Sequence, residues 1–102
     1  MVEVRFVAGT PEFTWEPACG VSRVSVRRFS TRPEGGDVVW AVDVNNPGVI
    51  APGVRYGRTP PGAQVRQPAV MLTPGASYTV YVRYIVGGDV LAGGGGAEFT
   101  QP

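Results

Sequence analysis

The residues of this chain that could carry chemistry are mainly nine arginines and eight acidic residues. The 102 residues include no histidine, and Cys19 is the only cysteine. This composition excludes Ser-His-Asp and Cys-His catalytic sites, zinc fingers with histidine ligands and any intramolecular disulfide. No neighbouring His or Lys can activate Cys19, so we predict an inert thiol.

Acidic residues are the other group that could act in catalysis or bind a metal. Glu12 with Glu16, and Glu34 with Asp37, are pairs of the kind that glycosidases use. Such pairs need a cleft and two different environments, for which a domain of this size leaves little room. The segment 43–46 (Asp-Val-Asn-Asn) supplies fewer oxygens than a calcium site requires. We therefore predict a protein that is not an enzyme, without catalytic, cofactor-binding or metal-binding residues.

The charge balance bears on nucleic-acid binding. Nine basic residues, all arginine, oppose eight acidic residues, which leaves a formal charge of +1. This is too balanced for the broad positive field of a non-specific nucleic-acid-binding protein. The arginines at 23, 27, 28 and 32 could pair with phosphates, but no nucleic-acid-binding motif accompanies them. We do not predict a nucleic-acid partner.

The elements that position these residues are predicted to be strands. Valine far outnumbers leucine and isoleucine, and 15 glycines and 10 prolines fall in clusters typical of turns. Apolar and polar residues alternate with period two, and no helical period competes. The predicted strands cover 1–8, 12–16, 21–29, 37–44, 63–72, 78–86 and 90–101, with a brief edge pairing at 54–56.

The alternation also predicts which side chains are buried. Trp15 and Trp40 are in register with apolar neighbours, so both are expected in the core and not on the surface as sugar-stacking platforms. A bulge or a strand end is expected near Arg27 and Arg28, because unbroken alternation would turn Arg28 inward. The run Gly93 to Gly96 is expected to interrupt the last strand as a mobile loop.

Three segments resemble fibronectin type III domains. They are Phe-Thr-Trp-Glu-Pro at 13–17, Gly-Val-Ser-Arg-Val-Ser-Val at 20–26 and, most specifically, Leu-Thr-Pro-Gly-Ala-Ser-Tyr-Thr-Val-Tyr-Val at 72–82. The resemblance implies an all-β, seven-stranded antiparallel immunoglobulin-like sandwich. It also implies that Tyr78 packs its ring in the core while its hydroxyl bonds to the backbone of the preceding loop. We expect one domain over 1–102, with a core from 11 to 101 and a first strand within 1–10.

The resemblance further predicts a shared surface. In such a sandwich the third, fourth and sixth strands belong to one sheet, so their outward residues would lie on one face: Arg23, Arg27, Val39, Tyr81 and Arg83. Tyr and Arg are enriched at interfaces, which makes this face the predicted partner-binding site. The alternative is a solvated face with ordinary cross-strand pairs.

These observations predict a non-catalytic module that acts as a spacer or as a protein-binding or adhesion domain. The resemblance places it in a bacterial extracellular or cell-envelope protein. No signal peptide or membrane-spanning run is apparent, since Glu3 and Arg5 interrupt the first apolar residues. One alternative is a carbohydrate-binding module that uses Tyr56, Tyr81 or an exposed Trp40. The other is a subunit that assembles with copies of itself. No cofactor is predicted.

Overall fold

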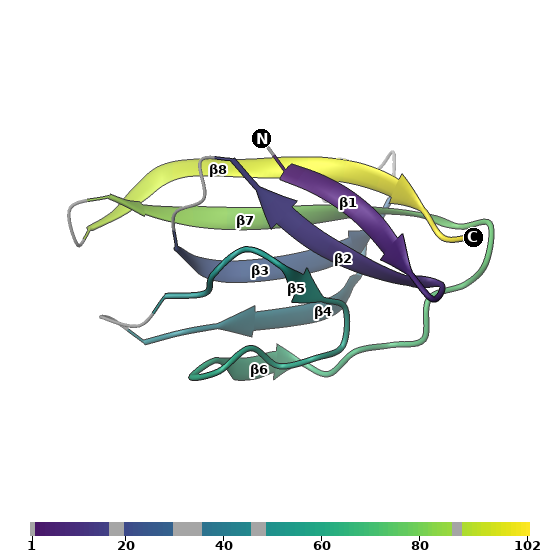
Figure 1. Ribbon diagram of the computed structural model, residues 1–102, viewed down its shortest axis with the longest axis horizontal. Coiled ribbons are helices and arrows are strands. Elements are labelled where there is room, and N and C mark those ends of the chain that lie inside the picture. Colours follow the sequence, from purple (N-terminus) through teal and green to yellow (C-terminus); the bar gives the residue numbers. More distant parts are fainter. Residues whose placement is uncertain (1, 17–19, 30–35, 46–48, 87–88) are drawn as a thin grey trace.

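Two antiparallel sheets contain all the strands that the computed structural model describes, over residues 2–16, 20–29, 36–45, 49–86 and 89–102. The smaller sheet has the order β1-β2-β5 and the larger sheet β6-β4-β3-β7-β8. Figure 1 shows β1, β2 and β5 lying across the larger sheet. The strands are β1 (Val2–Val7), β2 (Thr10–Trp15), β3 (Val21–Arg28), β4 (Val38–Asp43), β5 (Val54–Arg55), β6 (Gln64–Gln67), β7 (Ser77–Val86) and β8 (Asp89–Thr100).

The all-β class and the antiparallel sandwich are confirmed, but the predicted strand number is wrong. Eight strands form within the described residues where seven were expected. The short pairing at 54–56 is a strand, β5, that joins β2 in the smaller sheet. The predicted strand 63–72 contracts to β6, which ends before Pro68 and occupies an edge of the larger sheet. A proline has no N–H to donate to a ladder, so an edge is where it is tolerated. The arrangement is compatible with an immunoglobulin-like fold.

A tight hairpin joins β1 to β2. Val7 pairs with Thr10, and the two residues between them, Ala8 and Gly9, have φ angles of 52° and 80°. Positive φ at both central positions is the type I′ geometry, whose twist matches that of the flanking strands. Strands were expected at 1–8 and 12–16. The turn was missed because Ala-Gly is a weaker signal than Asn-Gly.

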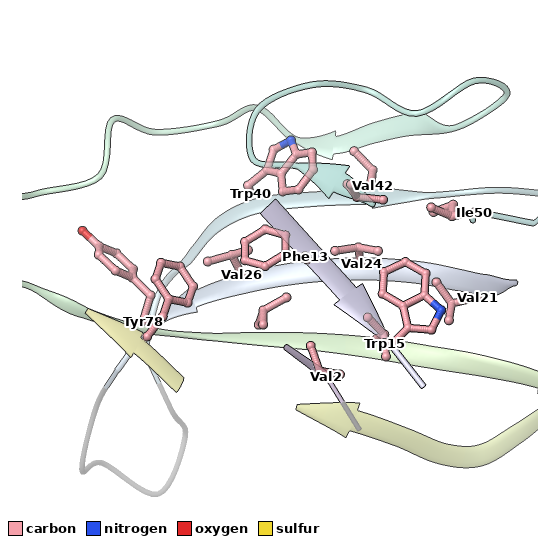
Figure 2. Packing of buried hydrophobic residues seen from close by; sticks show 14 of the residues in the cluster. Val2, Phe13, Trp15, Val21, Val24, Val26, Trp40, Val42, Ile50 and Tyr78 are labelled. Carbon is pink, nitrogen blue, oxygen red and sulfur yellow. The ribbon is translucent and has the colours of Figure 1, made fainter. Parts of the chain in front are cut away.

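The core lies between the sheets and confirms the predicted burial of both tryptophans. Trp15 and Trp40 are each 1% exposed. Figure 2 shows Phe13 and Trp15 of β2 gathered with the valines of β3 between the two layers. Because β-branched side chains are stiff and pack well on a pleated surface, this valine-rich chain builds its core from short strand segments.

A register shift confirms the irregularity predicted near Arg27. Val26 pairs with Trp40 of β4, whereas Arg27 pairs with Val38, so that Val39 has no partner of its own. Such a bulge places two residues of one strand opposite one residue of the other. The extra residue is in β4, so β3 keeps its alternation through Arg27 and ends at Arg28.

Tyr78 adopts the corner that the resemblance implied. Its side chain is 2% exposed, and its ring stacks on Phe99 with centroids 5.6 Å apart. The hydroxyl accepts a hydrogen bond of 2.8 Å from the Thr73 N–H. Between them, Ala76 N–H donates to the Thr73 carbonyl across a turn in which Gly75 has a φ of 83°. The buried ring is thus anchored, since its polar end is satisfied by the loop that precedes its strand.

The glycine run at 93–96 lies in strand β8, so the predicted loop there is wrong. β8 continues through it, with Gly94, Gly95 and Gly96 paired to Arg83, Val82 and Tyr81 of β7. The hairpin predicted at Gly87-Gly88-Asp89 falls partly outside the described residues, although Val86 pairs with Asp89. Backbone pairing with the long strand β7 keeps these glycines in a strand, although their composition by itself favours a loop.

Candidate partner-binding face

The central strands of the larger sheet bring four of the five predicted face residues together. Arg23 pairs directly with Arg83, and Ser25 pairs with Tyr81, across the β3–β7 ladder. Arg27 lies two positions beyond Ser25 on the same side of β3. We call Arg23, Ser25, Arg27, Tyr81 and Arg83 the Arg–Tyr face. The valines that alternate with these residues are buried in the core, so the Arg–Tyr face is the outer side of this part of the sheet.

Val39 is the predicted face residue that the structure does not place there. It is 8% exposed and belongs to the core cluster. Simple alternation put Val39 opposite Trp40, but the bulge between Val26 and Arg27 breaks that pattern. The Val39 carbonyl is also engaged, because it accepts a hydrogen bond from the Val70 N–H and lies 3.2 Å from the Tyr56 hydroxyl oxygen. The expectation that Val39 offers partner-binding surface is therefore corrected.

The Arg–Tyr face surrounds an open hollow of about 310 Å³, lined by its five residues together with Val82. Ser25 is a small residue between larger ones. Tyr81, 47% exposed, extends beside Gly96, where an added Cβ would lie 3.2 Å from its Cδ1. Because a glycine has no side chain, an aromatic ring on the neighbouring strand can pack in the space above it. Ser25 and Gly96 thus leave space on the sheet, and the arginines and Tyr81 surround it.

The electrostatics of this hollow favour an anionic ligand. Cβ atoms of directly paired residues are about 4.5 to 5.5 Å apart, so Arg23 and Arg83 place like charges side by side. The carboxylate of Asp43, which pairs with Arg23 in their row, accepts from the Arg66 Nε–H, which lies 2.8 and 2.9 Å from its two oxygens. Among the described residues, neither Arg23 nor Arg83 has an ion pair. Arg27 donates to the Gly36 carbonyl at 3.4 Å, a long contact.

A second, smaller hollow adjoins the first. It has a volume of about 170 Å³ and is lined by Ser22, Arg23, Asp43, Asn45, Arg66 and Arg83, with Val44. Arg23 and Arg83 contribute to both hollows and so form the wall between them. Two neighbouring guanidinium groups suit planar, bidentate recognition of a carboxylate.

The other residues named for the alternative of a carbohydrate-binding module, Trp40 and Tyr56, are not available for stacking. Trp40 is in the core, with its ring centroid 5.3 Å from that of Tyr56. The Tyr56 hydroxyl donates to the Val70 carbonyl at 2.6 Å and contacts the Val39 carbonyl at 3.2 Å. Burial raises the pKa of Tyr56 to about 12. Tyr56 therefore ties the loop after β6 to the bulge in β4, and Tyr81 is the predicted platform that keeps an exposed ring.

Glu12, one of the acidic residues considered for catalysis, forms an ion pair in the structure. Glu12 pairs with Arg5 across the β1–β2 ladder at 3.4 Å. Glu34 and Cys19 fall outside the described residues. Within the ranges that are described, no three Asp, Glu, Cys or His residues come close enough to hold a metal ion, and no helix has the length and apolarity needed to cross a membrane.

Another hollow, beside β5, was not predicted from the sequence. It measures about 520 Å³ and lies beside β5, where Val49, Pro52 and Pro60 meet Glu12, Arg55 and Arg58. Its shape comes from a proline-rich connection whose course no periodic pattern predicts. Ile50 anchors this connection by exchanging backbone hydrogen bonds of 2.8 and 3.0 Å with Val21.

No protein-family model, curated protein or solved structure matches this chain. The assignment of a function therefore depends on the geometry of the chain itself.

Proposed function

We propose that this protein is a non-catalytic immunoglobulin-like module that binds a protein partner through the Arg–Tyr face. The observation that carries the proposal is the open hollow of about 310 Å³ framed by three arginines and an exposed tyrosine. Tyr and Arg are enriched at protein interfaces because each combines a large contact area with directed hydrogen bonds.

The energetics of the face support a binding role. Like charges paired directly across two strands destabilise a sheet, and Arg23 opposite Arg83 is such a pair. A surface evolved only for solubility would more readily place an acidic residue at one of the two positions. A partner that places a negative charge beside Arg23 and Arg83 relieves their repulsion, and this relief favours binding.

The fibronectin type III resemblance extends the proposal to the kind of protein involved. Its most specific segment, 72–82, contains the Tyr78 corner, whose hydrogen bond to Thr73 supports the resemblance. We therefore propose a domain of a bacterial extracellular or cell-envelope protein, where such modules act as spacers and adhesion units.

The experiment that tests the binding role is a selection followed by mapping. A random peptide display library is selected against the immobilised protein, and the best peptide is titrated into the isotope-labelled chain while amide resonances are recorded. We expect the largest shifts at Arg23, Ser25, Arg27, Tyr81 and Arg83. A Tyr81→Ala variant should lose most of the binding, while Arg58→Gln, a surface change beside β5, should keep it. Shifts centred on the hollow beside β5, or equal binding by Tyr81→Ala, would contradict the proposal.

A carbohydrate ligand is the second candidate, favoured by the exposed ring of Tyr81 next to hydrogen-bonding groups of Ser25 and the arginines. Retention on immobilised neutral polysaccharides, lost in Tyr81→Ala, would favour it over a protein partner. If no immobilised polysaccharide retains the protein, a protein partner is the better assignment.

A further inference from the structure

The spacing of the arginines on the Arg–Tyr face defines the chemistry of its partner. This inference rests on the proposed function, that the face binds a protein. The outer positions of the sheet form parallel rows that run across the strands. The first row carries Asp43, Arg23, Arg83 and Gly94; the second Ala41, Ser25, Tyr81 and Gly96; the third Val38, Arg27, Thr79 and Glu98.

Positive charge is concentrated at two separate points of these rows. Arg23 and Arg83 stand together in the first row, and Arg27 stands in the third. Arg27 lies four positions along β3 from Arg23, which corresponds to about 13 Å. The row between them has no charged side chain within the described strands, and consists of small residues and the Tyr81 ring.

Among the residues that the structure describes, no ion pair joins an acidic side chain to Arg23, Arg83 or Arg27. The Asp43 carboxylate is engaged by Arg66. Glu98 shares the third row with Arg27, but Thr79 lies between them. Two strand spacings, about 9.6 Å, therefore separate the backbones of Arg27 and Glu98.

We propose that the Arg–Tyr face binds an extended protein segment with two acidic residues four positions apart. Arg23 and Arg83 share the first carboxylate, Arg27 binds the second, and the residue midway between them packs over Ser25 beside the Tyr81 ring. An extended segment rises about 3.3 Å per residue, so acidic residues at positions i and i+4 reproduce the separation of the arginines. With both on the same side of the segment, the i+2 residue faces the sheet between them.

The segment lies on the face of the sheet and adds no strand to it. The backbone groups of β3 are already bonded to β4 and β7 on either side. Recognition therefore depends on side chains, and the spacing of the carboxylates supplies the selectivity.

The test uses three fluorescently labelled peptides with blocked ends: SESLSES, its isomer SEELSSS and the uncharged SQSLSQS. Fluorescence anisotropy gives their affinities for the full chain and for Arg27→Gln, Arg83→Gln and the control Arg58→Gln. The two acidic peptides have the same composition and charge, so a difference between them reports spacing and not attraction to positive charge in general.

We expect SESLSES to bind roughly fivefold more tightly than SEELSSS, the effect of one exposed charge contact. Arg27→Gln should abolish that difference by weakening SESLSES alone, and Arg83→Gln should weaken both acidic peptides. Arg58→Gln should change neither. Melting curves of the variants will show that they fold, because all three substitutions replace side chains outside the core.

Equal affinities for the two acidic isomers, or a difference that survives Arg27→Gln, would overturn the spacing proposal. Such results leave the proposed function standing if library-selected peptides still shift the resonances of the Arg–Tyr face. If those peptides shift another surface instead, the proposed function fails as well. Binding of acidic peptides that Arg58→Gln reduces as much as Arg83→Gln would show general charge attraction and overturn the inference.

Discussion

The two sides of strands β3 and β7 consist of alternating residues of the same segments, but one side is apolar and buried and the other is polar. On the inner side Val24 pairs with Val82 and Val26 with Val80, and all four are buried. On the outer side the intervening positions pair Arg23 with Arg83 and Ser25 with Tyr81. Apolar pairs removed from water stabilise the fold, whereas the arginine pair opposes it. The contrast indicates that stability comes from one side and that the other is available for recognition.

The largest test of this contrast replaces one aromatic residue on each side. Trp40→Ala removes a ring that is 1% exposed and packs on Tyr56, so the free energy of unfolding should fall by about 3 to 5 kcal/mol. Tyr81→Ala should lower it by roughly 1 kcal/mol or less, since Tyr81 is 47% exposed. Urea unfolding of both variants measures these values. Similar losses would show that the outer side also supports the fold.

A smaller change separates two tyrosines of the same strand. Tyr78→Phe leaves the Thr73 N–H without the hydroxyl that accepts its hydrogen bond, and we expect a loss of about 1 to 2 kcal/mol. Tyr81→Phe is the matched control, and its midpoint in urea should be unchanged. An unchanged midpoint for Tyr78→Phe would mean that water replaces the hydroxyl without cost and that the corner adds little to stability.

The pH dependence of stability should report the buried end of Tyr56. The folded pKa of about 12 lies above the ordinary value of 10.0, so the folded protein holds this proton more tightly than the unfolded chain. The stability that Tyr56 contributes is therefore complete below pH 10 and is lost as the pH rises through about 12. Urea midpoints should fall less steeply over this interval in Tyr56→Phe than in the wild type. Parallel curves would assign the alkaline loss to other groups.

The smallest expected effect concerns the like-charged pair itself. Arg83→Glu places a carboxylate opposite Arg23 and should stabilise the protein by a few tenths to about 1 kcal/mol. Because the pair is at the surface, high salt should reduce the gain. Arg58→Glu gives the same change in net charge at a site without such a partner and serves as the control. A rise in melting temperature that is equal in both variants would trace the effect to net charge.

Much of the fold follows from local patterns in the sequence. Period-two alternation predicted the buried sides of Trp15 and Trp40, because successive side chains of a strand point to opposite faces. The segment 72–82 predicted the Tyr78 corner, since turn, anchor and strand lie within a few residues of one another. The irregularity near Arg27 was predicted from the alternation, because Arg28 would otherwise have faced the core.

Other features could not be predicted because they depend on which strands become neighbours. Val39 alternates as an outward residue in its own segment, but its pairing with β3 skips it and turns it into the core. The glycines at 94–96 favour a loop by composition, yet β7 provides a ladder for them. The Arg–Tyr face has elements of both kinds, since parity predicted the direction of its arginines and the β3–β7 register placed Arg23 opposite Arg83.

The sequence by itself determined the β class, the direction of most side chains and the absence of histidine and paired-cysteine chemistry, because all of these depend on residue type and on a period of two. Only the tertiary structure decided that there are two sheets of three and five strands, that Val39 is buried and that three arginines surround one hollow. Strand partners and registers are chosen by contacts between residues far apart in the chain, where burial of the whole core outweighs any local preference.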